Sequence, residues 1–96
     1  MFIVIISCPP IKVGKGAAFQ KWFVSSNQAF CKSSGFINRR LLKPVNGRNY
    51  AAIVGFKDQA AFQAMHSSPT HDEAGDQVRP LFDGKPTPTF YQVIVE

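Results

Sequence analysis

The chain of 96 residues has few cysteines and no long apolar segment. Its two cysteines, Cys8 and Cys31, stand in neither a CxxC nor a Cys/His spacing, which favours free thiols in a reducing cytoplasm over a disulfide. The apolar start, MFIVIISCPP, has no basic residue before it, is too short to span a bilayer and stops at two prolines. We therefore expect a strand there instead of a signal peptide, and a cytoplasmic protein without a membrane partner.

Acidic residues are missing from the first 57 positions, whereas nine of the eleven lysines and arginines lie there. All six acids follow from Asp58 onward, and the formal net charge is +5. A basic half of this kind can attract an anionic ligand such as a phenolate, a carboxylate or nucleic acid. Because the basic residues are scattered and form no recognisable binding motif, we favour the alternative of a solvated surface whose two halves complement each other.

The apolar pattern predicts the order strand, helix, strand, strand, helix, strand. Residues 2–7 (FIVIIS) and 50–56 (YAAIVGF) are apolar throughout, as expected of inner strands, whereas residues 36–43 (FINRRLLK) mix apolar and basic side chains like an edge strand. The link KPVNGR between the middle strands carries the Asn-Gly signal of a tight hairpin. Residues 89–96 (TFYQVIVE) alternate like a half-buried strand.

Residues 17–35 have the period of a helix, which Gly35 is expected to end. Two shorter helices are predicted after it, over residues 58–66 and from Ser68 onward. In the first helix, one stripe of side chains recurs at spacings of three and four: Phe19, Trp22, Phe23, Ser26 and Phe30.

This order of elements favours a ferredoxin-like βαββαβ fold of the α+β class, a single domain over residues 1–96 with the antiparallel sheet order 4-1-3-2. Helices would cover one face of the sheet. Ile3, Ile5 and Ile53 make the other face too apolar for water, so we expect it to pack on a second copy in a homodimer. The chain lacks the Gly-aromatic motif of RNA-binding proteins with this topology, so no nucleic-acid partner is expected.

Two histidines and three acids gather in the stretch AFQAMHSSPTHDEAGD. A metal ion needs three or four converging ligands, and His66 and His71 are not an i, i+4 helical pair because a proline separates them. Ser68 and Pro69 are typical of a helix start, with a capping box of Thr70 and Glu73 as the alternative. The acids suit the first turn of that helix. We therefore expect no metal site here, with His66 at the end of the preceding helix.

The segment GFINRRLLKPVNGRNYAAIVGFKDQAAFQAMHSSP resembles the core of the antibiotic biosynthesis monooxygenase family. In that family a Gly-apolar strand, a hairpin, an apolar strand ending in an aromatic, a Glu/Asp-x-x-AF helix and a Ser-Pro helix start recur in this order. KVGKGAAF is similar to the family's approach to its first helix. The resemblance implies a dimeric α+β barrel and cofactor-independent oxygenation of phenols or quinols, in which the deprotonated substrate passes an electron to O2.

Oxidative degradation of haem is a second activity that the resemblance implies. The haem-degrading branch of the family uses an Asn on the first strand, a Trp in the second helix region and a haem-ligating His on the next helix. Those positions appear here as Ser7, Met65 and Ala74 or Gly75, so none of the three is kept. His71 lies about one helical turn before the expected ligand and could reach a similar space. We rank this activity below phenol or quinol oxygenation, and keep a non-catalytic dimeric module that binds a small aromatic molecule as a further alternative.

His71 is the candidate catalytic residue, because histidine titrates near neutrality and this one falls in the first turn of a helix expected to line the pocket. It would accept the phenolic proton of the substrate or hold the phenolate; an exposed or capping histidine is the alternative. Asn38 and Arg40, expected on one strand face with Phe36 and Leu42, could orient a flat substrate or form a solvated edge. The candidate substrate-binding residues are Phe19, Trp22, Phe23, Ser26, Asn38, Arg40, Met65 and Phe82, and for the aromatic ones an ordinary core is the alternative.

Overall fold

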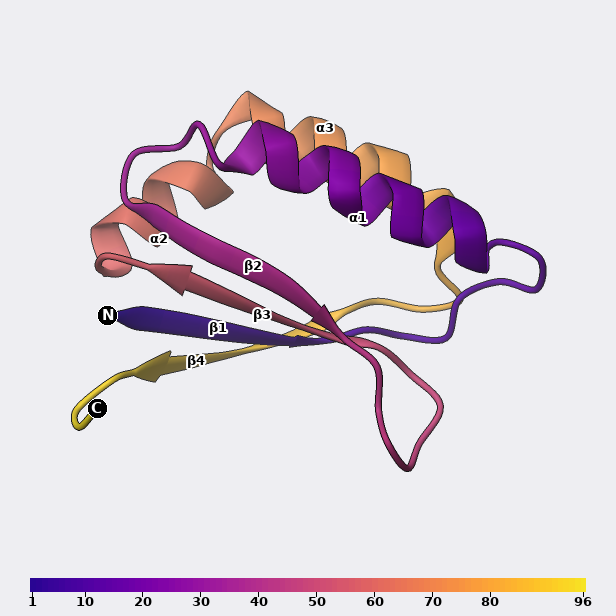
Figure 1. Ribbon diagram of the computed structural model, residues 1–96. Coiled ribbons are helices and arrows are strands. Elements are labelled where there is room, and N and C mark those ends of the chain that lie inside the picture. The colour runs from indigo at the N-terminus through magenta and orange to yellow at the C-terminus, as the bar shows by residue number, and fades with distance from the viewer.

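Four antiparallel strands form one sheet in the order β2-β3-β1-β4, which confirms the predicted α+β class and the ferredoxin-like sheet order 4-1-3-2. The computed structural model describes residues 1–96 (Figure 1). Its elements are β1 (Phe2–Ser7), α1 (Gly16–Phe30), β2 (Phe36–Leu42), β3 (Ala51–Phe56), α2 (Gln59–His66), α3 (Pro69–Val78), the 3-10 turn η1 (Arg79–Leu81) and β4 (Thr87–Gln92).

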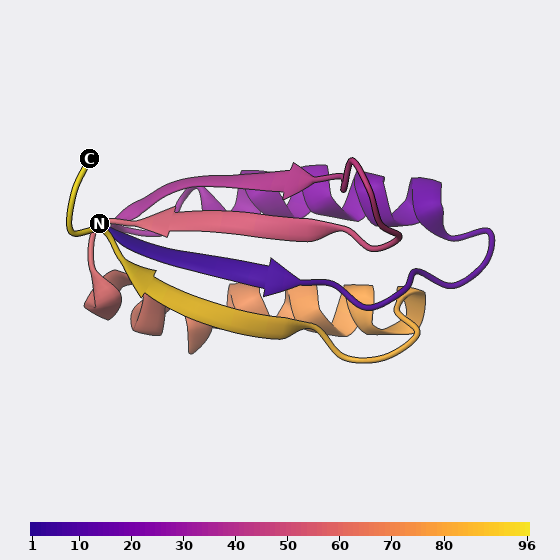
Figure 2. The same ribbon diagram turned by 90° about the horizontal axis from the view of Figure 1, so that it is seen from below.

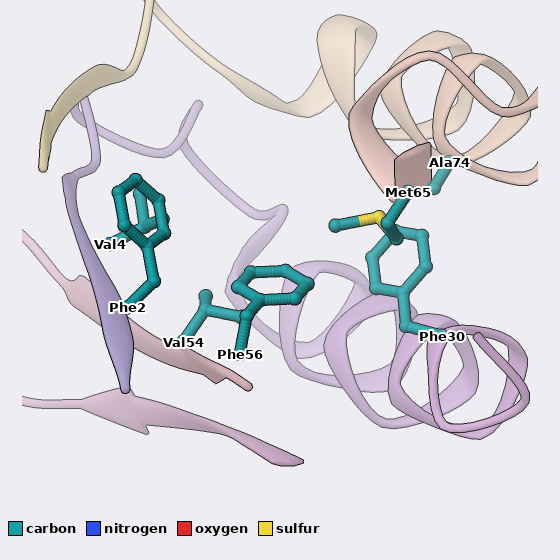
Figure 3. Packing of buried hydrophobic residues seen from close by; sticks show 7 residues of the cluster. All are labelled: Phe2, Val4, Phe30, Val54, Phe56, Met65 and Ala74. Carbon is teal, nitrogen blue, oxygen red and sulfur yellow. The ribbon is translucent and has the colours of Figure 1, made fainter. Parts of the chain in front are cut away.

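The helices lie on one face of the sheet, and Figure 2 shows the opposite face with no element in front of it. The two apolar strands, β1 and β3, occupy the middle of the sheet as predicted. None of the helices combines the length and apolar composition that crossing a membrane requires. The larger core cluster fills part of the space between sheet and helices (Figure 3): it joins Phe2, Val4, Val54 and Phe56 from the strands to Phe30, Met65 and Ala74 from the helices.

The two short helices begin at the side chains that the sequence indicates. Asp58 Oδ1 accepts a hydrogen bond from the backbone N–H of Ala61 at 2.8 Å, which caps α2. Ser68 Oγ accepts from the backbone N–H of His71 at 3.2 Å and caps α3, whose first residue is a proline. His66 is the last residue of α2. These caps confirm the predicted helix start at Ser68 and place His71 in the first turn of α3.

The predicted hairpin between β2 and β3 is confirmed, but the prediction of a tight turn is wrong. The two strands stop at Leu42 and Ala51, and residues 43–50 form a longer loop between them. Pro44 has no N–H to donate to a ladder, and the side chain of Val45 is fully solvated at 97% exposure. Pairing across this loop would therefore lose a backbone hydrogen bond without burying an apolar side chain.

The last strand also differs from the prediction of a half-buried strand over residues 89–96. β4 spans Thr87–Gln92, and all six of its residues are exposed in the single chain. It is an edge strand that pairs only with β1, and Phe90 and Tyr91 each remain 50% exposed. Alternation along the sequence shows that two faces exist, but burial depends on what covers them.

A β-bulge near the start of β2 changes which side chains face the helices. Phe36 pairs with Phe56, but the next partner of β3, Gly55, pairs with Asn38, so that Ile37 is an extra residue. Side chains alternate between the two faces of a strand, and one extra residue reverses that alternation. The expectation that Asn38 and Arg40 share a face with Phe36 is therefore wrong.

Beyond the bulge, the two adjacent arginines point to opposite faces of the sheet. Arg39 pairs with Val54, which is buried beneath the helices, whereas Arg40 pairs with Ile53 and is exposed. The bulge thus turns Arg39, and not Arg40, towards the space between sheet and helices.

Candidate functional site

A cavity of about 720 Å³ lies between the sheet and the helices. This volume falls within the range of about 300–1,000 Å³ that small-molecule sites in proteins occupy. Its lining is mostly apolar and aromatic. Among the lining residues that are not exposed, only Cys8, Arg39 and His71 carry titratable groups. No group of three or more His, Cys, Asp or Glu side chains is arranged to hold a metal ion.

The cavity brings together most of the residues that the sequence predicts for the site, from α1, α2, α3 and the segment before β4. His71, Phe19, Trp22, Phe23, Met65 and Phe82 all line it. Ser26 lies outside this lining, buried in α1, and Asn38 and Arg40 are exposed on the far face of the sheet. For all of these residues, the roles in binding and catalysis remain predictions.

The aromatic stripe of α1 serves as core and as cavity wall at once. The fully buried ring of Phe19 lies 5.3–5.7 Å, centroid to centroid, from the rings of Trp22, Tyr50 and Phe82. Trp22 Nε1 donates a hydrogen bond to the backbone oxygen of Ala74 at 3.0 Å and so ties α1 to α3. A rigid aromatic wall of this kind suits a flat apolar ligand.

His71 packs between aromatic rings at the α2–α3 end of the cavity. Its ring centroid is 4.4 Å from that of His66 and 6.3 Å from that of Phe30. Burial lowers the pKa of His71 below its ordinary value of 6.5; the neighbouring His66 and, more weakly, Arg39 act in the same direction, whereas Asp72 opposes them. His71 is therefore neutral at pH 7 and able to accept a proton.

Arg39 is the cavity residue that the sequence reasoning missed. Its Nη1 donates to Ser26 Oγ at 2.8 Å, to Asn27 Oδ1 at 2.9 Å and to the backbone oxygen of Phe23 at 3.2 Å. The guanidinium carbon also lies 3.8 Å from the ring centroid of Phe23 and 5.0 Å from that of Phe30, a cation–π arrangement. The sequence contains only part of the signal: two adjacent arginines on a strand must point to opposite faces, so one of them faces the helices, but alternation alone does not show which.

The charge of Arg39 has no acidic partner. The only ion pair in the structure joins Arg79 to Asp76, at 2.7 Å on the surface. Burial lowers the pKa of Arg39 to about 10, so it remains a cation at neutral pH. Burial raises the pKa of Cys8, which is therefore an uncharged thiol at pH 7. The cavity consequently combines an uncompensated positive charge, a neutral imidazole and aromatic walls.

Comparison with known proteins identifies a curated relative and several structural neighbours, although no family model matches the chain. A mycobilin-producing haem oxygenase from Mycobacterium tuberculosis is 30% identical over 86 residues, which cover 88% of this chain and 82% of that protein. A variant of the protein MhuD, solved with two manganese protoporphyrin IX molecules bound per active site, is 25% identical with a TM-score of 0.81 and coverage of 100% of this chain and 97% of that chain.

Other solved structures share the fold at lower identity. SnoaB, a cofactor-independent oxygenase from Streptomyces nogalater, is 18% identical with a TM-score of 0.82 and covers 99% of this chain and 95% of its own. A Nitrosomonas europaea protein assigned to the antibiotic biosynthesis monooxygenases is 14% identical with a TM-score of 0.85, over 99% of this chain and 100% of that chain. The curated relative, at 30% identity, is named a haem oxygenase, which supports an oxidoreductase, whereas these solved structures at lower identity show the shared fold. From the identity to the curated relative and these shared folds, we conclude that the chain belongs to the antibiotic biosynthesis monooxygenase family.

Proposed function

We propose that the chain is a monooxygenase that uses O2 to oxidise a phenolic or quinol-type aromatic molecule, without a metal or flavin. One observation carries the proposal: a neutral His71 and a cationic Arg39 line the same apolar cavity and lie near the same ring, that of Phe30. A base and a cation arranged in this way favour the deprotonated form of a phenol.

The chemistry follows from that pair of groups. His71 accepts the phenolic proton, and the field of Arg39 stabilises the phenolate in a site of low polarity. The electron-rich anion then passes an electron to O2. With no added reductant the substrate must supply all four electrons that reduce O2. Conversion of a ring CH2 group of the keto tautomer to a carbonyl meets this requirement, with one oxygen atom entering the product and the other leaving as water.

The homodimer belongs to the same proposal. Ile3, Ile5 and Ile53 alternate with the buried Val4 and Val54 and so lie on the face of the sheet that no helix covers, and each is half-buried in the single chain. Figure 2 shows this face of the sheet. A large apolar face of this kind is seldom left in water. Packing of two such faces gives the dimeric α+β barrel, with one cavity in each subunit on the helix side.

Haem degradation is the second candidate, favoured by the 30% identity to the mycobacterial haem oxygenase. In this chain two imidazoles, those of His66 and His71, line the cavity and could approach the iron of a haem substrate. The resemblance places the haem-ligating histidine of the relatives at Ala74 or Gly75, and neither residue has a metal-binding side chain. The backbone oxygen of Ala74 accepts the hydrogen bond from Trp22. Of the two imidazoles, that of His71 lies about one helical turn before this position, so we take His71 as the haem ligand of this second candidate.

Oxygen uptake by metal-free protein, measured with a panel of quinols and phenols, tests the proposal. We expect turnover above background with at least one of them, sharply reduced by His71→Ala and unchanged by Glu73→Ala, an exposed residue two positions along the same helix. No turnover with any compound would favour the non-catalytic binding module. Titration with haemin tests the second candidate, which requires a Soret shift that His71→Ala removes.

A further inference from the structure

We propose that the cavity is a carboxylate site, in which the free edge of the Arg39 guanidinium binds the carboxylate of a flat aromatic acid. The existence of this carboxylate-binding site does not depend on the proposed function. The further step, that the bound acid is the substrate of the oxygenase, rests on the proposed function. The substrate would then be a hydroxylated aromatic carboxylic acid.

The hydrogen bonds of Arg39 leave one particular edge of its guanidinium free. All three hydrogen bonds that the side chain donates come from Nη1, to Ser26, Asn27 and Phe23 of α1. Nε and Nη2 of Arg39 donate no hydrogen bond within the chain. Every fully buried side-chain nitrogen or oxygen in the structure has a hydrogen-bond partner, so these two atoms cannot be fully buried and retain accessible surface. The N–H groups of Nε and Nη2 are parallel donors along one edge of the plane, which is the geometry that a carboxylate accepts with both of its oxygens.

Neighbouring aromatic rings hold the free edge of the Arg39 guanidinium in place, and no acidic side chain of the chain neutralises its charge. The guanidinium packs over Phe23, with Trp22 and Phe30 at 5.1 and 5.0 Å from its central carbon. Stacking and the three Nη1 bonds fix the plane before any ligand arrives, so little conformational entropy is lost on binding. The only ion pair of the chain lies elsewhere, on the surface. A ligand carboxylate would therefore supply the missing negative charge.

The cavity also fits the remainder of such a ligand. The walls next to Arg39 are aromatic, and the total volume of about 720 Å³ accommodates a ring system of two or three fused rings. His71 also lies near Phe30, at 6.3 Å between ring centroids, and lines the same cavity. An acid anchored at Arg39 can therefore extend its ring towards the proposed base.

Calorimetric titration with naphthoate and with its uncharged analogue naphthamide tests the inference, because neither compound needs to be turned over. We expect wild-type protein to bind naphthoate about tenfold or more tightly than naphthamide, as for charge-assisted hydrogen bonds in a dry site. Arg39→Gln should reduce this preference to within about twofold, and Arg39→Lys should weaken it because an ammonium lacks the fork. Arg48→Gln, which removes the same charge from the exposed loop, should leave the preference unchanged.

Equal affinities of wild-type protein for the two compounds would overturn the inference, and this comparison needs no variant to fold. A preference that persists in folded Arg39→Gln protein would also overturn it. If the protein prefers naphthoate but oxidises no phenol or quinol, the result supports the carboxylate site and contradicts the proposed oxygenase activity. Turnover of phenols without any preference for carboxylates would overturn the carboxylate site and leave the oxygenase standing.

Discussion

Gly35, in the connection between α1 and β2, offers the sharpest test of the backbone, through the substitution Gly35→Ala. Its φ of +79° lies in the left-handed region, where a residue with a Cβ costs about 1–2 kcal/mol. A Cβ added there would also lie 2.5 Å from Cβ of Ala61 in α2. Both carbons are attached directly to backbone, so the overlap cannot be relieved by rotating a side chain, and overpacking of this kind costs about 1–3 kcal/mol.

Together these terms predict that Gly35→Ala lowers the free energy of unfolding by at least about 2 kcal/mol, or Tm by about 8–16 °C for a chain of this size. Thermal unfolding followed by circular dichroism measures the change. Gly16→Ala is the matched control, because Gly16 begins α1 with no positive φ and no atom within 4 Å of an added Cβ. That variant should be neutral or stabilised by about 0.5 kcal/mol.

A second substitution separates the two causes. Ala61→Gly removes the overlap but keeps the backbone strain. Gly35→Ala should therefore cost less stability in an Ala61→Gly background than in the wild type, a comparison that cancels the helix propensity that Ala61→Gly itself loses. A Gly35→Ala variant within about 0.5 kcal/mol of the wild type, which is the usual range for neutral surface changes, would refute the backbone described for this connection. An equal cost of Gly35→Ala in the two backgrounds would refute the contact between α2 and the connection.

Three further predictions concern the site and the assembly. Because burial holds the pKa of His71 below 6.5, kcat/KM should fall only as the pH drops through a midpoint below 6.5. The free energy of unfolding should fall in the same pH window, since the histidine of the unfolded chain takes up a proton at higher pH than the folded one. A midpoint above 6.5 would contradict this prediction. Trp22→Phe removes the hydrogen bond to Ala74 and Ser68→Ala removes the cap of α3, each lowering the unfolding free energy by about 1 kcal/mol in chemical denaturation. Ile53→Asp on the uncovered sheet face should abolish the dimer in light scattering and cost folding as well, and a stable folded dimer of this variant would refute the proposed interface.

Much of the fold could be predicted because its determinants are local. Apolar runs identified the inner strands, and the side chains of Asp58 and Ser68 marked where α2 and α3 begin. The same reasoning placed His71 in the first turn of α3, and the structure adds that it lines the cavity. Caps and periodicity depend on neighbours within a few residues, so a single sequence contains them.

The errors came from features that depend on distant parts of the chain. Exposure of Phe90 is decided by whether a helix or a second sheet covers β4, and alternation along the strand does not contain that information. Arg39 was missed because the extra residue Ile37 reverses the alternation of β2, and the pairing with β3 that creates the bulge is a tertiary property. The polar partners on α1, Ser26 and Asn27, also become meaningful only when α1 lies across β2.

The bulge in β2 has a consequence for comparing this chain with its homologues. Arg39 and Arg40 are chemically identical neighbours, and a gap placed one position away in an alignment exchanges them without changing the score much. Their environments differ completely, because one arginine faces the cavity and the other the far side of the sheet. A homologue that kept all these residues but paired the strand without the bulge, with Phe36 still facing the helices, would turn the opposite arginine inward. Ligand preference within the family could thus change through the pairing of β2 with β3 alone, with every side chain in the strand conserved.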